Sequence, residues 1–247
     1  MIGRDKFLEE CDKWKSGCEA NIINQLKKIG LSCDFNKVTF TLDQSYSDKV
    51  IDTFVKLYQG GLIYKGNYMT NWCTALETAI SDEECTTTEE EIQLYYINYK
   101  LDDDSSEYLT VATTRPETLF GDVAVAYNPN DERYIKYKGK NVIVPIINKS
   151  VKLIEDERIK IEFATGLCKI TPAHDKDDFI TGSKHNLPII NIFDKAGHII
   201  NTNTKYDTMY KDKASKEIVK ELSELNLLVK IEKKKSNVSR CSRSGVI

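Results

Sequence analysis

Two short segments of the chain carry most of the side chains that could do chemistry. The first, Thr113-Thr114-Arg115-Pro116-Glu117-Thr118, follows a stretch with strand-like alternation. Thr114 and Glu117 have the spacing of a capping box, and Pro116 suits the first turn of a helix. The pattern predicts a short helix whose free N–H groups lie beside Arg115 and threonine hydroxyls, facing a ligand rich in oxygen atoms. A well-capped helix start without a ligand is the alternative.

The second segment runs from Lys169 to Asp178. Lys169 and Thr171 are two residues apart on a predicted strand, so their side chains share one face. Asp175 and Asp178 are three apart at a predicted helix start, where the helix dipole stabilises anions. A carboxylate held ionised there could receive an ammonium group of a ligand. Plain N-capping by acidic residues is the alternative.

Other reactive side chains lack a supporting pattern. His174, His185 and His198 do not have metal-ligand spacing, and no C-x-x-C pair occurs. Ser183 and His185 could be drawn into a triad, but no nucleophile-elbow glycines surround the serine. Cys168 is predicted to lie in the core and not to act as a nucleophile.

Apolar spacing predicts the elements that must position these segments. Helices are expected over 5–29, from Ser45 or Ser47 to Gln59, after Pro172, and over 212–226. Strands are expected over 92–101, Tyr108–Thr114, 123–127, 141–147, 150–154, 166–171, 188–193 and Leu227–Ile231. Many short strands with few helices predict an α+β fold in which a β-barrel-like, strongly curved sheet has helices packed outside.

The composition restricts the class of protein. The chain has 247 residues, of which 40% are hydrophobic, enough to bury a core. No apolar run approaches the roughly 20 residues that a membrane span needs. Seven irregularly spaced cysteines favour reduced thiols and a cytoplasmic location.

The net charge argues against a strong nucleic-acid binder. It is −3, whereas such proteins usually carry a basic excess. One basic stretch lies between Lys230 and Arg243. A solvated charged face is the preferred interpretation. Contact with a nucleic acid would therefore be local or made by other parts of a larger protein.

Together the motifs resemble the editing (CP1) domain of valyl-tRNA synthetases, over almost the whole chain. The two segments above carry the resemblance, as do the flanking stretches Gly121–Ala126, Asn128–Tyr134 and Arg240–Gly245. Leucyl enzymes favour Arg-Pro-Asp-Thr, where this chain reads Arg115-Pro116-Glu117-Thr118. Isoleucyl enzymes favour Gly-His-Gly, where this chain reads Ala173-His174-Asp175. The valyl pattern fits best.

The resemblance implies an aminoacyl-ester hydrolase that removes threonine from mischarged tRNA(Val). A synthetic pocket rejects the isosteric threonine by only about 10²-fold, so a second, polar pocket is needed. Asp178 would receive the α-ammonium group, and Asp175 and Lys169 would read the side-chain hydroxyl. The remaining predicted site residues would hold the terminal adenosine and the ester and position the water: Thr113, Arg115, Thr118 and Thr171.

The resemblance also implies the organisation of the chain. Residues 1–70 would form a helical segment connecting to the synthetase core, 71–235 the editing domain, and 236–247 the return to the core. The partners would be the 3′ end of tRNA(Val) carrying threonine and the synthetase catalytic core, with no membrane partner and a monomeric state. No signature of an aminoacylation site occurs, so no cofactor is expected here; ATP and magnesium would serve the core.

Some family members hold zinc through two C-x-x-C half-sites at the neck of this domain. Here the half-sites read Cys73-Thr74-Ala75-Leu76 and Cys241-Ser242-Arg243-Ser244, so each keeps one cysteine of two. Because structural zinc takes about four ligands, no metal is expected. The functional alternatives are the editing domain of a leucyl or isoleucyl enzyme, a free-standing deacylase, and a non-catalytic tRNA-binding appendage.

Overall fold

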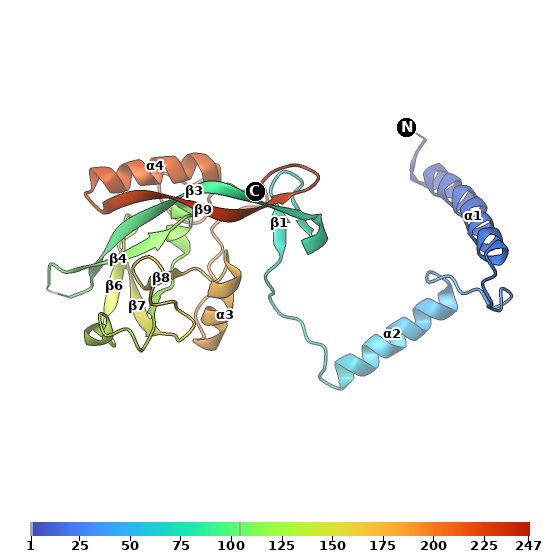
Figure 1. Ribbon diagram of the computed structural model, residues 1–247, viewed down its shortest axis with the longest axis horizontal. Coiled ribbons are helices and arrows are strands. Elements are labelled where there is room, and N and C mark those ends of the chain that lie inside the picture. The colour runs from blue at the N-terminus through green and yellow to red at the C-terminus, as the bar shows by residue number, and fades with distance from the viewer. Residues whose placement is uncertain (1, 104) are drawn as a thin grey trace. The chain divides into compact units, whose positions relative to one another are not determined.

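The computed structural model describes residues 2–103 and 105–247 and divides the chain into two compact units (Figure 1). Unit 1 is Met1–Asn67 and unit 2 is Tyr68–Ile247. The sequence led us to expect a change of domain at 70/71 and another at 235/236. The second of these positions lies inside the last strand of unit 2, which ends at Cys241.

Unit 1 consists of two helices, α1 (Arg4–Lys28) and α2 (Gln44–Gln59). Both predicted helices are therefore confirmed to within about two residues. Each is followed, two residues after its last residue, by a glycine with positive φ, Gly30 at 83° and Gly61 at 70°. The amide after each glycine donates to a carbonyl five residues back, at 3.1 Å and 3.0 Å. This C-terminal arrangement needs the left-handed conformation that glycine adopts without strain.

Unit 2 is built around a seven-stranded sheet and a two-stranded one. The two-stranded sheet pairs β1 (Asn71–Cys73) with β2 (Thr78–Ile80). The strands of the large sheet are β3 (Cys85–Leu101), β4 (Tyr108–Thr113), β5 (Ala124–Tyr127), β6 (Asn141–Val144), β7 (Lys149–Glu155), β8 (Leu167–Ile170) and β9 (Leu228–Cys241). Its helices are α3 (Lys176–Lys184) and α4 (Lys211–Glu224), with 3-10 turns η1 (Asp82–Glu84), η2 (Pro116–Gly121) and η3 (Ile135–Tyr137).

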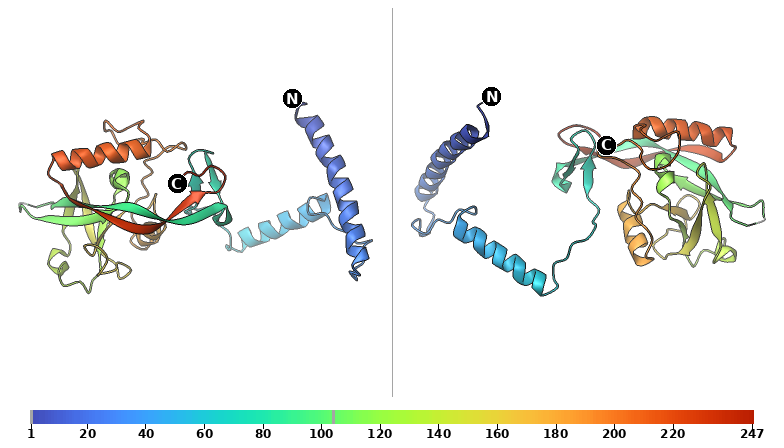
Figure 2. Two further views of the ribbon diagram at one scale, coloured as in Figure 1. Left: turned by 45° about the horizontal axis from the view of Figure 1, so that its top comes forward. Right: turned by 180° about the vertical axis from the view of Figure 1, so that it is seen from behind.

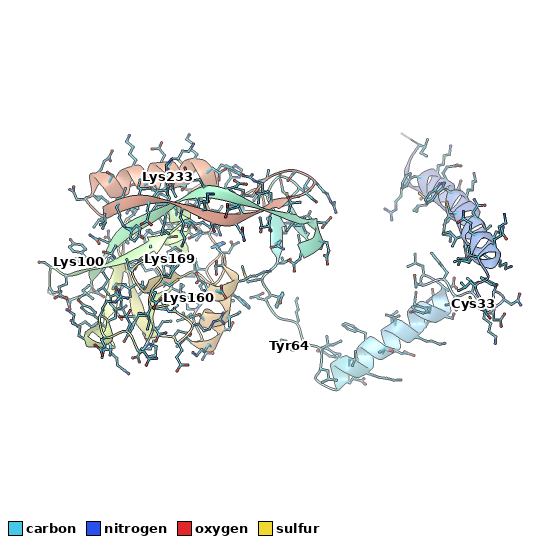
Figure 3. The ribbon with its side chains drawn as sticks, in the orientation of Figure 1. Cys33, Tyr64, Lys100, Lys160, Lys169 and Lys233 are labelled. Carbon is cyan, nitrogen blue, oxygen red and sulfur yellow. The ribbon has the colours of Figure 1, made fainter. Side chains whose placement is uncertain are left out.

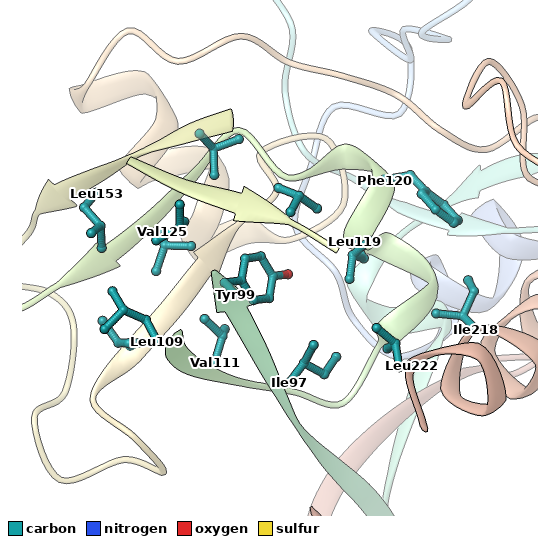
Figure 4. Close-up of a cluster of buried hydrophobic side chains, with 14 of the residues drawn as sticks. Ile97, Tyr99, Leu109, Val111, Leu119, Phe120, Val125, Leu153, Ile218 and Leu222 are labelled. Carbon is teal, nitrogen blue, oxygen red and sulfur yellow. The ribbon is translucent and has the colours of Figure 1, made fainter. Parts of the chain in front are cut away.

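The large sheet curls strongly, which confirms a mixed fold with a barrel-like sheet. Its order is β4-β3-β6-β7-β5-β8, with β9 paired to β3. The end strands β4 and β8 also lie against each other, so the sheet nearly closes on itself. The enclosed core joins strand residues to α4, as Figure 4 shows for Tyr99, Val111, Leu119 and Ile218. The predicted strands at 123–127 and 150–154, and both predicted helices of this unit, are confirmed within a few residues.

The strands β3 and β9 are much longer than the sequence indicates. Strands were expected over 92–101 and 227–231, whereas the two pair antiparallel from Cys85 to Ile97 and run side by side in every view (Figure 2). Runs of charged side chains on both strands interrupt the apolar–polar alternation by which a strand is predicted. Cross-strand ion pairs replace it, with Lys233–Glu91 and Arg240–Glu90 each at 2.8 Å. The basic stretch thus faces acidic partners, in agreement with a solvated charged face.

The prediction of a strand over 188–193 is wrong. Within the described chain this region contributes a single bridge, between Phe193 and Ile199. The run lies in irregular structure, in which Ile192 is 1% exposed and Ile189 is 46% exposed. A short apolar run does not by itself distinguish a strand from a loop that packs against the core at some of its residues.

The strand expected over 141–147 ends at Val144, because Pro145 follows it and Ile146 has a φ of 68°. A proline offers no N–H to continue the ladder, and a positive φ turns the chain away from the sheet. Over residues 2–103 and 105–247, no helix combines the length and hydropathy required to span a membrane.

Candidate functional site

The junction between β8 and α3 holds the first two predicted carboxylates. Asp175 is the N-cap of α3, and its Oδ1 accepts from the backbone N–H groups of Asp177 at 2.9 Å and Asp178 at 3.1 Å. Plain N-capping, the alternative considered from the sequence, therefore accounts for this oxygen. The Oδ2 atom takes no part in the cap, and the Asp175 side chain is exposed.

Asp178 is 9% exposed, and its Oδ2 accepts from the backbone N–H of Thr171 at 2.8 Å. Burial raises the pKa of Asp178 to about 7, and nearby Asp175 adds to this, while the Thr171 bond opposes it. The helix start was expected to hold this carboxylate ionised. Burial outweighs the helix dipole, since desolvation penalises the charged form of a carboxyl group. The site therefore contains an acid poised near neutral pH.

Lys169 lies in the middle of unit 2, where Figure 3 labels it, and belongs to a buried polar cluster. Its Nζ donates to Thr171 Oγ1 at 2.5 Å, which confirms that the two side chains share one face of the strand. Nζ also pairs with Asp122 Oδ1 at 2.9 Å, and the Thr171 hydroxyl donates to the same oxygen at 2.9 Å. Tyr99 OH donates to Asp122 Oδ2 at 2.7 Å.

Sequence reasoning gave Asp122 no role. It stands in an almost entirely apolar run, between Leu119-Phe120-Gly121 and Val123-Ala124. A charged residue inside such a run is rarely buried unless it is paired. Its position in the run therefore predicts that Asp122 has an oppositely charged or hydrogen-bonding partner. Its partners come from β3 and β8, so their identity depends on tertiary structure.

The segment Thr113–Thr118 forms the opposite wall. The predicted capping box of Thr114 and Glu117 is wrong: the 3-10 turn η2 begins after Arg115, with no side-chain cap. Instead Glu117 Oε1 lies 3.2 Å from Arg115 Nε. The Arg115 backbone is held on both sides, because its N–H donates to Thr113 Oγ1 at 3.1 Å and its carbonyl accepts from Thr118 Oγ1 at 2.8 Å.

Two contacts bring this wall to the β8–α3 junction. Arg115 Nη1 donates to the carbonyl of His174 at 2.9 Å. A Cβ added to Gly121 would lie 2.9 Å from Thr171 Cγ2, so η2 approaches the junction at a distance that only glycine permits. The structure therefore brings all seven predicted site residues into one region.

Replacing Gly121 with alanine is expected to lower the free energy of unfolding by about 1–3 kcal/mol, because the added methyl group overpacks the wall against Thr171. Urea unfolding measures the change. Gly17→Ala is the matched control, since nothing lies within 4 Å of its Cβ position and alanine favours the helix. Equal stability of the two variants would contradict the close approach.

His174 was likewise not predicted from the sequence to belong to the site. Burial, helped by the charges of Arg115 and Lys169, lowers the pKa of His174 to about 3. Its Nε2 accepts from the backbone N–H of Ile192 at 3.2 Å, and its ring packs edge-on against Phe193 with centroids 4.9 Å apart. A neutral histidine in this position shapes the wall and cannot act as a general acid near neutral pH.

Cys168 is half-buried, and burial raises the pKa of its thiol to about 12. Because the thiolate is the reactive form, this direction agrees with the expectation that Cys168 does not act as a nucleophile.

The remaining half-site cysteines, Cys73 and Cys241, are both buried and pack in one cluster with Ile80. Cys73 Sγ lies 3.2 Å from Ser244 Oγ, the position at which a second cysteine would complete the other half-site. Two thiols and a hydroxyl fall short of the four strong ligands of structural zinc, so these residues do not fit the metal. Among the described residues, no group of three or more His, Cys, Asp or Glu is placed to hold a metal ion.

The model of the family of class I tRNA synthetases (I, L, M and V) matches residues 1–238. The chain therefore belongs to the class I tRNA synthetases. Within that family it is similar along its whole length to valine–tRNA ligases. It is 47% identical over 247 residues to that of Carboxydothermus hydrogenoformans, 43% over 245 residues to that of Synechocystis, and 43% over 246 residues to that of Thermotoga maritima.

These alignments cover 99–100% of the chain and 27–28% of each relative, so the chain spans about a quarter of their length. Among solved structures, the chain is similar to a LeuRS of Agrobacterium radiobacter K84, in a ternary complex with tRNA and LeuAMS. That match has a TM-score of 0.43 and 16% identity, and it covers 81% of this chain and 33% of that one. A likeness of this size carries no argument about function.

Proposed function

We propose that this chain is the editing (CP1) domain of a valine–tRNA ligase and hydrolyses the ester that links threonine to mischarged tRNA(Val). The observation that carries the proposal is the convergence of a buried carboxyl group and a buried ammonium group on one strand–helix junction. Asp178 and Lys169 are both bonded to Thr171, through its backbone N–H and its hydroxyl. A cluster of polar groups of this kind suits a small, amine-bearing, hydroxylated ligand.

Asp178 is the partner of the α-ammonium group in this proposal. Its raised pKa reflects a buried carboxyl group without a cation directly bonded to it. An arriving ammonium group stabilises the ionised form and makes a charge-assisted hydrogen bond. An aminoacyl ester carries this free α-amine, whereas the ester of an N-acylated amino acid has an uncharged amide nitrogen in its place.

Two groups bind the threonine hydroxyl in this proposal: the Lys169 ammonium group donates to it, and Asp175 Oδ2 accepts from it. Valine fills the same volume but leaves both groups without a partner. An unsatisfied buried polar group costs about 1–3 kcal/mol, and this penalty falls on the buried Lys169, whereas the exposed Asp175 adds less to the exclusion of valine. This selects against the correct product, as an editing pocket must.

Arg115 and Thr171 contact the terminal adenosine and the ester, while Thr113 and Thr118 hold the Arg115 backbone in place. A water molecule attacks the ester carbonyl, the bond to the ribose oxygen breaks, and that oxygen leaves with a proton as a hydroxyl group. We assign the acceleration to positioning and to electrostatic stabilisation of the tetrahedral intermediate. Water is the only reactant of this step besides the ester.

The partners in this proposal are the 3′ end of tRNA(Val) and the catalytic core of the ligase, with residues 1–70 as the connection to that core and residues 236–247 as the return. In unit 1, neither α1 nor α2 has a buried residue, although both carry large apolar side chains such as Trp14 and Phe54. Such faces suit contact with a larger body. A monomeric state in the cytoplasm belongs to the same proposal.

The test is hydrolysis of threonyl- and valyl-tRNA(Val) by the full-length gene product that contains this chain. We expect the threonyl ester to be hydrolysed at least about 10²-fold faster than the valyl ester. Preference for a leucyl- or isoleucyl-tRNA product would assign the domain to a sister enzyme. Binding of tRNA without hydrolysis of any ester would support a non-catalytic appendage and overturn the proposal.

A further inference from the structure

The carboxyl group behind the pocket is the most completely buried charged group of the site. The Asp122 side chain is 0% exposed. Oδ2 accepts from Tyr99, and Oδ1 accepts from both Lys169 and Thr171. Asp122 has no opening to a ligand, yet it is bonded to two of the residues that the proposed function places at the substrate.

The bonds to Asp122 and Thr171 fix the direction of the Lys169 ammonium group. An ammonium group has three N–H bonds. In Lys169 one is directed to Asp122 Oδ1 and a second to Thr171 Oγ1, which leaves the third for a ligand. The side chain is 8% exposed, so it has little room for another rotamer. A free surface lysine would have no such preference.

A second ammonium group lies near Asp122, because Lys149 Nζ donates to the Asp122 backbone carbonyl at 2.8 Å. Burial lowers the pKa of Lys149, and the charge of Asp122 opposes this. The pKa of Tyr99 lies well above its usual value through burial, so Tyr99 remains a donor. The titratable groups that face this cluster come from β3, β7, β8 and the start of α3: Tyr99, Lys149, Cys168, His174, Asp175 and Asp178.

We propose that Asp122 is a positioning residue of the editing pocket: it is the counter-charge of the Lys169 ammonium group and aims the remaining N–H of that group at the hydroxyl of the substrate. This inference rests on the proposed function and adds a residue to it. Thr171 links the two halves of the pocket, because its hydroxyl binds Asp122 and its backbone N–H binds Asp178. Thr171 thereby fixes the position of Lys169, which would bind the substrate hydroxyl, relative to Asp178, which would bind the substrate amine.

Asp122→Asn tests the inference in the full-length gene product. The amide keeps the size of the side chain and can still accept from Lys169 and Thr171, but it removes the charge. A buried ammonium group without its anion loses its proton more readily. We expect kcat/KM for the threonyl ester to fall about 100-fold at pH 8.5 and only about 10-fold at pH 6.5, relative to wild type.

Asp131→Asn is the matched control, because Asp131 is 3% exposed and paired with Arg133 at 2.6 Å, outside the pocket. Its pH profile should run parallel to that of the wild type. A pH-independent loss in Asp122→Asn would reduce Asp122 to a structural residue and overturn the inference. Absence of hydrolysis by the wild type would instead refute the proposed function.

A second readout does not depend on hydrolysis. In NMR spectra of the 247-residue chain, the two Lys169 ε-methylene protons should give separate signals in the wild type, because Asp122 and Thr171 hold the side chain, and should approach one averaged signal in Asp122→Asn. The same separation in both would overturn the inference. If Asp122→Asn does not fold, Tyr99→Phe removes a single bond to the carboxylate and should lower kcat/KM about fivefold. Unchanged kcat/KM in Tyr99→Phe would then overturn it.

Discussion

Asp178→Asn is expected to lower the hydrolysis of threonyl-tRNA(Val) by about 10²–10³-fold at pH 8. Asparagine fills the same space, and its Oδ1 can still accept from the backbone N–H of Thr171. The charge that would pair with the substrate ammonium is lost, and removal of one partner from a buried charged pair costs about 2–5 kcal/mol. A deacylation time course with threonyl-tRNA(Val) measures the effect.

The same carboxyl group sets the pH dependence of the wild type. Because burial raises the pKa of Asp178 to about 7, a growing share of molecules carries a neutral Asp178 as the pH falls below 7. The kcat/KM for the threonyl ester should therefore fall about tenfold per pH unit between pH 6 and 5. The asparagine variant should lose this dependence together with its activity.

Activity and stability should respond in opposite directions. The folded pKa of Asp178 lies above its unfolded value, so its contribution to stability is complete below the unfolded value and is lost as the pH rises through about 7. Asparagine resembles the protonated form at every pH. The variant should therefore resist urea better than the wild type at pH 8. Loss of both activity and stability would indicate a folding defect and contradict the assignment.

Lys169→Met should have the largest effect on stability. The substitution leaves the Asp122 carboxylate 0% exposed without its cation, and breaking a buried ion pair in this way costs about 3–5 kcal/mol. Urea unfolding of the chain at pH 7 measures the loss. Adding Asp122→Asn should recover most of it, because the second substitution removes the unpaired charge.

Lys233→Met is the matched control for this cycle. Lys233 forms an ion pair of similar length with Glu91, 2.8 Å, but both side chains are more than 60% exposed. An exposed pair contributes about 0–1 kcal/mol, so this variant should differ little from the wild type. If Lys169→Met costs no more than Lys233→Met, the buried cluster does not stabilise the domain as we describe.

The sequence predicted those parts of the fold that local patterns determine. The helices α1 and α2 have apolar spacing and glycine stops, and both were predicted closely. The long strands β3 and β9 were only partly predicted, because their stability comes from charged cross-strand partners far apart in the chain. The strand predicted over 188–193 is a loop, because only part of its apolar run packs into the core and the segment forms a single bridge.

The same division applies to the site. Lys169, Thr171 and Asp178 were predicted because one strand–helix junction holds them, and their relation can be derived from spacing. Asp122 was not, because it lies between η2 and β5 and its role depends on Tyr99 in β3 and Lys169 in β8. The ionisation of Asp178 was also beyond the sequence, since it depends on how deeply the helix start is buried.

The most direct measurement is the pKa of the Asp178 carboxyl group, followed by carbon-13 NMR with and without a threonyl-adenosine analogue in which an amide replaces the ester. An ammonium group bonded to Asp178 should lower its pKa from about 7 to about 5. The valyl analogue at the same concentration should change it much less. A titration of Asp178 that the saturating threonyl analogue leaves unchanged would contradict the account.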